Sequence, residues 1–179
     1  MPENKPEYVQ LDMNFNRFDS LPELMLPKGY SLSTLQERSD DDWIEALNAT
    51  GELGVWDRKR AAETLKSERH PIREGTFIVM FAGEPVATAC VVVPTPAEKR
   101  PEMGWVSASP EHQGKGLGFQ VSVAALHFMK QLGYLETFLH TDDFRLPAIK
   151  TYLKLGFEPQ IIHDSHPGRW KAVLERLSR

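Results

Sequence analysis

Residues 103–119 read MGWVSASPEHQGKGLGF, and this stretch decides the predicted fold. An apolar run ends at Ser109-Pro110, and a charged bend follows it. Glycine then occupies every second position, at Gly114, Gly116 and Gly118, and an apolar pattern of helical period begins directly afterwards. A strand, a glycine loop and a helix in this order turn backbone amides toward a phosphate at the helix N-terminus, because amides without a neighbouring Cβ can converge on it.

Two common phosphate-binding loops do not fit these residues. A P-loop requires glycine at position 109 and Ser or Thr after Lys115, where the chain has Ser109 and Gly116. A dinucleotide-binding fingerprint requires a third glycine at the position of Phe119. The pattern that remains is Gln113-x-x-Gly116-x-Gly118.

This pattern resembles the acyl-CoA signature of the GNAT superfamily of N-acyltransferases, Arg/Gln-x-x-Gly-x-Gly/Ala. A second segment, AIKTYLKLGF at residues 148–157, is similar to the C-terminal motif of that family, in which a helix carries tyrosine four residues before Gly-Phe. Because both motifs occur in the family's order and context, residues 30–175 are identified as a member of it. A looser likeness to the mycothiol-synthase branch, in PKGYSL and TDDFRLPAIKTY, sets no substrate.

The resemblance implies an α/β (mixed α+β) fold: a single GNAT-like domain with a central, mostly antiparallel twisted sheet. The sheet is expected to be splayed at the acyl-CoA site and flanked by about four helices. Periodicity predicts strands at 30–35, 76–81, 86–93, 103–108, 135–140, 157–162 and 170–174, and helices beginning at Asp40, Asp57, Leu117 and Pro147. The acidic run at the first helix start, 40–42, suits the helix dipole better than an amine-binding patch.

We expect two parts in the chain. Residues 1–28 have no sustained period and several prolines, which predicts an extended N-terminal arm whose leucines (Leu21, Leu24 and Leu26) lie against the body. Residues 29–179 are then the acyl-CoA-binding domain.

Composition excludes several classes of function. Acidic and basic residues are mixed and the formal net charge is −4, which argues against nucleic acid and anionic membranes as partners. No apolar run approaches the ~20 residues of a membrane span, and the N-terminus lacks the apolar core of a signal peptide. A single cysteine, Cys90 in VATACVVV, predicts a reducing cytoplasm and a buried thiol, not a nucleophile.

By resemblance, the main chain of Val106, Ser107 and Ala108 pairs with the pantetheine arm of acetyl-CoA, the acyl donor. The amides of the glycine loop then hold the pyrophosphate; they belong to Gln113, Gly114, Lys115, Gly116, Leu117, Gly118 and Phe119. The Lys115 side chain either contacts a phosphate or faces water. No metal is expected, because the pair His163 and His166 has no further ligand at metal-binding spacing.

Two residues are candidate catalytic groups. Tyr152 matches the family position that protonates the departing thiolate, and the alternative is a core tyrosine. Glu102 lies eleven residues before Gln113, the offset of the general-base glutamate in histone-type members; the alternatives are an exposed glutamate and deprotonation through water. Strand parity places Glu102 on the face of Gly104, Val106 and Ala108.

The chain departs from the family pattern at Arg145, where asparagine is common. Arg145 is expected to pair with Asp142 or Asp143, or to meet an acidic substrate. His112 and His140 are near the expected site, and the sequence does not separate a functional role from packing for either.

The leading hypothesis is an N-acyltransferase that moves an acetyl or short acyl group from acyl-CoA directly to a primary amine of a small molecule or peptide. The alternative is a non-catalytic acyl-CoA-binding sensor or regulatory module. Retention of both Tyr152 and Glu102 favours the enzyme. The acceptor, the acyl length and the oligomeric state are left open, a homodimer being one option.

Overall fold

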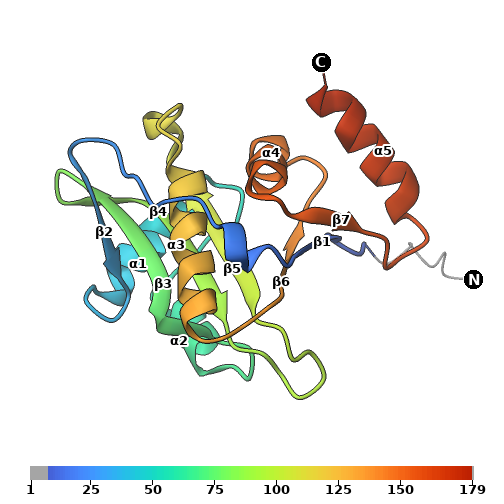
Figure 1. The fold of residues 1–179 in the computed structure, drawn as a ribbon. Helices are drawn as coiled ribbons and strands as arrows, with labels where there is room; N and C mark the ends of the chain where they lie inside the picture. The colour runs from blue at the N-terminus through green and yellow to red at the C-terminus, as the bar shows by residue number, and fades with distance from the viewer. Residues whose placement is uncertain (1–7, 179) are drawn as a thin grey trace, which may run out of the picture.

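A computed structural model describes residues 8–178 (Figure 1). A seven-stranded sheet runs through the molecule in the order β2-β3-β4-β5-β6-β1-β7. Every neighbouring pair is antiparallel except β5 and β6, which are parallel. The strands are β1 Leu11–Phe15, β2 Tyr30–Thr34, β3 Pro71–Phe81, β4 Glu84–Val92, β5 Glu102–Ala108, β6 Thr137–Thr141 and β7 Glu158–Gln160. The predicted single domain with a mostly antiparallel sheet is confirmed.

Helices cover both faces of the sheet. They are α1 Asp40–Asn48, α2 Arg58–Lys66, α3 Leu117–Gln131, α4 Leu146–Leu155 and α5 His166–Leu177. The first two enclose a smaller core built on Trp43 and Trp56. The other three contribute to the main core on the opposite face. The predicted start of α1 is confirmed, since Ser39 and Asp42 form a reciprocal capping box.

The predicted arm contains a strand that sequence analysis missed. Strand β1 lies between β6 and β7 and pairs with both, and its Leu11 and Met13 are fully buried. Residues 11–15 of the predicted arm therefore belong to the sheet, while its residues 1–7 lie outside the described residues. Of the three arm leucines, Leu21 and Leu26 pack against the main core and Leu24 is exposed.

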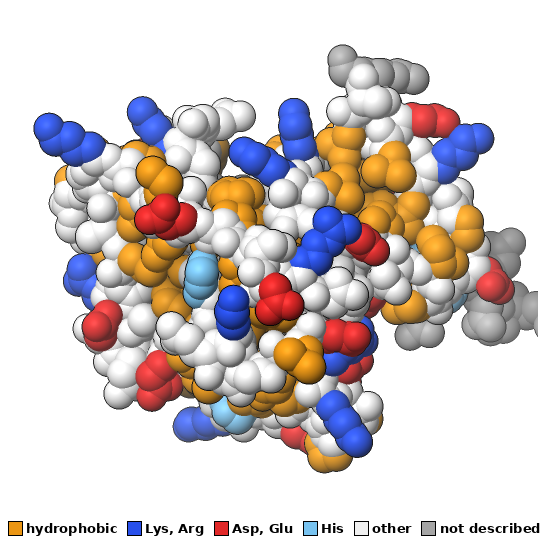
Figure 2. Space-filling view, in the orientation of Figure 1, with side chains coloured by type: hydrophobic (Ala, Val, Ile, Leu, Met, Phe, Trp, Pro, Cys, Tyr) orange, Lys and Arg blue, Asp and Glu red, His pale blue; other side chains and the backbone are white. Residues whose placement is uncertain are grey.

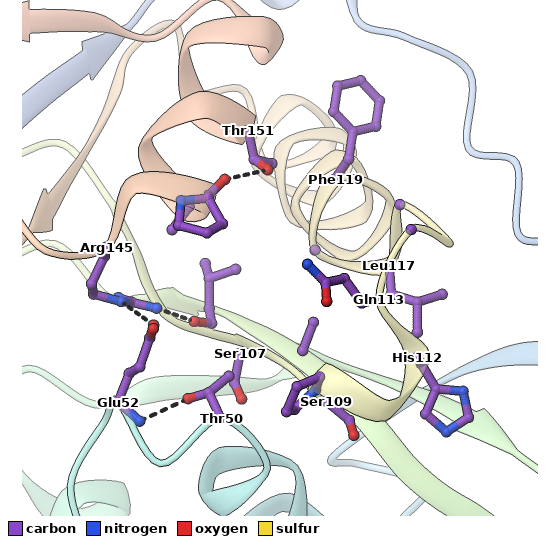
Figure 3. A pocket seen from close by; sticks show the side chains of 18 residues that line it. Thr50, Glu52, Ser107, Ser109, His112, Gln113, Leu117, Phe119, Arg145 and Thr151 are labelled. Carbon is purple, nitrogen blue, oxygen red and sulfur yellow. Dashed lines mark hydrogen bonds and ion pairs between the residues drawn. The ribbon is translucent and has the colours of Figure 1, made fainter. Parts of the chain in front are cut away.

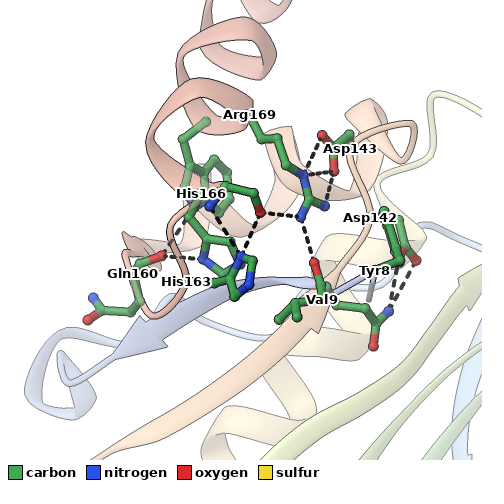
Figure 4. A network of polar contacts seen from close by, with 11 residues as sticks. Tyr8, Val9, Asp142, Asp143, Gln160, His163, His166 and Arg169 are labelled. Carbon is green, nitrogen blue, oxygen red and sulfur yellow. Dashed lines mark hydrogen bonds and ion pairs between the residues drawn. The ribbon is translucent and has the colours of Figure 1, made fainter. Parts of the chain in front are cut away.

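The strand predicted at 170–174 is wrong, because this segment belongs to α5. Its buried residues His166, Trp170 and Val173 have helical spacing, and Pro167 suits the first turn. Figure 4 shows how α5 is held: Arg169 donates to Asp143 and, at 2.6 Å, to the Val9 carbonyl before β1. In the sheet, β1 occupies the position next to β6, and β7 is the last strand beyond it.

A bulge in β5 changes which side chains face each side of the sheet. In the pairing of β5 with β4, Ser107 lies opposite Thr88 and Gly104 lies opposite Cys90. Two residues of β5, 105 and 106, therefore lie opposite the single residue Ala89 of β4. Trp105 has a φ of 47° and packs against Trp43 and Trp56 on the α1 side. Alternation along the strand is therefore broken at this point.

The surface gives no sign of an extended charged patch on the face seen in Figure 2, where acidic and basic side chains are interspersed. Over residues 8–178, none of the helices combines the length and the apolar character that crossing a bilayer demands.

Candidate active site

The loop before α3 presents a set of free backbone amides. Gly114 and Gly116 have φ values of 78° and 70°, and a Cβ on either would meet no atom within 4 Å. Among residues 8–178, no protein acceptor takes a hydrogen bond from the amides of residues 114–119. These six N–H groups meet the positive end of a 15-residue helix, which is a geometry suited to a pyrophosphate.

A cleft of about 330 Å³ opens between this loop, β5 and the start of α4 (Figure 3). All the predicted donor-binding residues except Lys115 line it: Val106, Ser107, Ala108, Gln113, Gly114, Gly116, Leu117, Gly118 and Phe119. Besides Lys115, a second cation lies near the loop: the Lys154 ammonium is 4.9 Å from the centroid of the Phe119 ring. Nothing in the sequence indicated this contact. The cleft thus has a row of free backbone amides at one end.

The other end of the cleft lies where β5 and β6 diverge. The two strands pair only at Glu102 and Phe138, so the backbone of β5 beyond that point is not covered by β6. A sheet that opens in this way leaves unpaired main-chain groups, to which an extended amide-bearing arm can add like a strand. Val106 and Ala108 line the cleft beyond this point.

Arg145 fills part of this opening. Its Nη2 donates to the Val106 carbonyl at 2.8 Å, and its Nε donates to Glu52 at 3.2 Å. The prediction that Arg145 pairs with Asp142 or Asp143 is wrong: Asp142 accepts from Tyr8, and Asp143 pairs with Arg169. Sequence analysis missed Glu52, because only the fold brings the connection between α1 and α2 to the cleft.

Tyr152 lies behind the cleft wall. Its side chain is buried beside Phe157, with the ring centroids 6.0 Å apart, and it is not among the lining residues. Burial raises the pKa of its phenol to about 12; nearby Arg145 opposes this shift and Glu52 adds to it. The phenol therefore holds its proton at neutral pH and lies within electrostatic reach of the Arg145–Glu52 pair.

Glu102 shares a face with Gly104, as predicted, but faces away from Val106 and Ala108, so the predicted parity is wrong beyond the bulge. Met103 and Val106 both belong to the main core although they are three residues apart, because the bulge at residues 105 and 106 breaks the alternation of the strand. Glu102 points to the opposite side, where it pairs with Arg69. Burial raises the pKa of the Glu102 carboxyl, and His140 and Arg69 partly offset this.

The histidines differ in their surroundings. His140 Nδ1 lies 3.3 Å from Asp12 Oδ2, and this hydrogen bond raises the pKa of the imidazole on the same side of the sheet as Glu102. His112 lines the cleft and shares a hydrogen bond of 2.7 Å with the Tyr30 hydroxyl. Neither His140 nor His112 had been assigned a role from the sequence.

The remaining candidate ligands and nucleophiles lie apart from the cleft. Cys90 is fully buried, as predicted, and burial raises the pKa of its thiol to about 12. His163 contacts Ser165 and His166 contacts the Gln160 carbonyl, both at the start of α5 (Figure 4). Within the described part of the chain, no three metal-ligating side chains come together.

Comparison with known proteins adds to this geometry. A model described as the acetyltransferase (GNAT) family matches residues 35–157. A mycothiol acetyltransferase from Nocardia farcinica is 29% identical over 148 residues, which cover 78% of this chain and 48% of that protein. A mycothiol acetyltransferase from Amycolatopsis mediterranei is also 29% identical, over 87% of this chain and 54% of its own length. The chain spans about half the length of the curated relatives it matches.

Solved structures share the fold. An aminoglycoside acetyltransferase from an uncultured soil metagenomic sample superimposes with a TM-score of 0.60 at 15% identity, covering 78% of this chain and 96% of that one. The ribosomal-protein-S18-alanine N-acetyltransferase from Escherichia coli superimposes with a TM-score of 0.58 at 20% identity, covering 74% and 79%. At these identities the likeness concerns the fold alone.

Proposed function

The chain belongs to the acetyltransferase (GNAT) family, and we propose that it moves an acetyl or short acyl group from acyl-CoA to a primary amine of a small molecule or peptide. The observation that carries this proposal is the row of six free amides at residues 114–119, which ends a cleft that continues to the divergence of β5 and β6. A pyrophosphate bound to the amides leaves the pantetheine arm directed along β5.

Acyl transfer to an amine requires a base for the amine and an acid for the thiolate. Tyr152 is protonated at neutral pH and is proposed as the acid. Glu102 is proposed as the base. Its side chain lies on the face of β5 that is opposite to the main core, where it pairs with Arg69. Direct transfer is favoured over a covalent acyl-enzyme, because the Cys90 thiol is fully buried. We expect a cytoplasmic location, because a sequence with a single cysteine is typical of a reducing compartment.

A panel of amines incubated with acetyl-CoA tests the enzyme against the non-catalytic sensor. The readout is the amine-dependent release of free CoA thiol, with mass detection of the acetylated product. We expect release with at least one class of primary amine and none with the matched alcohols. Tight CoA binding with no amine-dependent release across sugar amines, polyamines and peptide N-termini would favour the sensor.

A further inference from the structure

The Val106 carbonyl has an unusual partner. Because Val106 lies in the bulge, it has no partner residue in the β4 ladder, and β6 pairs with β5 only at Glu102. A buried carbonyl needs a hydrogen bond, and Arg145 supplies one at 2.8 Å. The guanidinium thus takes the place of a missing sheet neighbour at the point where the donor arm is proposed to lie.

Arg145 is itself enclosed, with its side chain only 7% exposed. A buried guanidinium is costly without a counter-charge, and Glu52 provides it through the bond from Nε. The Glu52 side chain is 40% exposed, so the pair reaches from the cleft wall to solvent. Figure 3 shows the Arg145 guanidinium pointing toward the Glu52 carboxylate.

Glu52 belongs to the connection between α1 and α2, which is otherwise anchored on its own side. The Asn48 side chain bonds both backbone groups of Trp56 at 2.9 Å, and the Trp56 indole donates to the Leu53 carbonyl at 3.1 Å. The Glu52–Arg145 pair joins this connection to the start of α4, across the cleft. Changes at the Val106 carbonyl can therefore reach the α1–α2 connection through one side chain.

Building on the proposed donor site, we propose that Arg145 is a positioning residue that couples binding of the acyl donor to the order of residues 49–55. The pantetheine arm carries amide N–H groups, and one of them takes the Val106 carbonyl. Arg145 then turns its released donors to Glu52, and the carboxylate holds the α1–α2 connection against the cleft. Donor binding thereby strengthens the contact that already joins residues 49–55 to the start of α4.

Hydrogen exchange of residues 49–55 tests this coupling with two ligands. CoA carries the pantetheine arm, whereas adenosine 3′-phosphate 5′-diphosphate keeps the pyrophosphate and lacks the arm. In the wild-type protein, saturating CoA should slow exchange at 49–55 by about fivefold or more, the usual lower range of coupling between sites. The nucleotide should bind at the glycine loop and leave this exchange unchanged.

Glu52→Gln removes the charge at a partly exposed position and should abolish the effect of CoA on residues 49–55. Because coupling is reciprocal, its Kd for CoA should rise by the same factor, with the Kd for the nucleotide unchanged. Arg145→Lys should behave similarly, since an ammonium cannot bridge two acceptors in the planar geometry of guanidinium. Glu63→Gln, an exposed change on α2, is the matched control and should respond as wild type.

Equal exchange at 49–55 in CoA-bound and nucleotide-bound wild-type protein would overturn the coupling, and so would a wild-type response of Glu52→Gln. A wild-type protein that binds neither ligand would contradict the proposed function instead. The wild-type comparison of the two ligands decides the question even where a variant fails to fold.

Discussion

At the scale of single residues, Tyr152 combines a structural and a chemical requirement. Its ring is part of the main core, beside Phe157. Burial keeps the phenol protonated, while Arg145 adds a positive charge nearby. A proton donor for a thiolate needs both a retained proton and an environment that stabilises the developing anion.

Tyr152→Phe removes the oxygen and keeps the ring. We expect a melting temperature and CoA affinity close to wild type, and turnover lower by about 10²-fold if the hydroxyl is the acid. Steady-state turnover with the best amine from the panel measures this. Tyr134→Phe, at a partly buried tyrosine away from the cleft, is the matched control. Unchanged turnover in Tyr152→Phe would make the hydroxyl structural.

Glu102→Gln tests the proposed base through pH. A base acts when ionised, so activity is lost as pH falls through its pKa, and burial raises this pKa above the ordinary range of a glutamate. The wild-type acid limb should therefore lie at a higher pH than that of a free carboxyl. Glu102→Gln should remove this limb and lower turnover by about 10²–10³-fold, with CoA affinity unchanged.

Exposed Glu74→Gln is the control for this change and should keep the wild-type pH profile. A Glu102→Gln enzyme that retains both the turnover and the acid limb of the wild type would assign deprotonation to water or to another group. His140, whose charge acts on Glu102, is then the next side chain to examine.

At the scale of elements, the placement of β1 is the main feature of the fold. This strand inserts between β6 and β7 and brings Asp12 opposite His140. It lies outside residues 35–157, which match the family model, although Leu11, Met13 and Phe15 belong to the main core. The N-terminal segment is therefore a structural part of the sheet.

Two methionines, Met13 in β1 and Met25 after it, test whether β1 contributes to the stability of the fold. Met13→Ala in β1 removes a fully buried side chain and should lower the free energy of unfolding by about 2–5 kcal/mol. Met25→Ala, where the side chain is 67% exposed, should change it by no more than about 0.5 kcal/mol. Denaturant unfolding measures both. Equal small effects would mean that β1 is dispensable to the sheet.

At the scale of the whole molecule, the two faces of the sheet serve different parts of the site. The glycine loop and α4 belong to the side of the main core, whereas Trp105, Glu102 and the α1–α2 helices belong to the other. The cleft proposed to hold the acyl donor lies at the gap between β5 and β6, where the two sides meet. Ligand binding at that gap should stabilise the entire domain.

We expect CoA at a hundredfold excess over its Kd to add about 2.7 kcal/mol of stability. For a domain of this size the melting temperature should rise by about 5–10 °C, and EDTA should not change the shift. Gly118→Val should abolish it, because the added side chain enters the cleft and meets only the Ala108 Cβ, at 4.0 Å. Gly168→Val, also in an open first helical turn, should keep it.

Local patterns in the sequence determined much of this protein. The glycine spacing predicted the loop and the N-terminus of α3, the Ser39 cap predicted α1, and Pro147 and Gly156 bounded α4 to within a residue. These features depend on residues a few positions apart, since capping, helical period and glycine conformation act over one or two turns. The predicted donor-binding residues, apart from Lys115, line one cleft because they lie close together in the chain.

Only the tertiary structure decided the features that join distant segments. The pairing of β1 with β6, the face of Glu102 and the Glu52–Arg145 bond each depend on contacts between residues more than thirty positions apart. A short strand carries little local signal, and one extra residue at the Trp105 bulge reverses the side to which Glu102 points. Such choices are made by packing and by the need to satisfy buried polar groups, which no local pattern records.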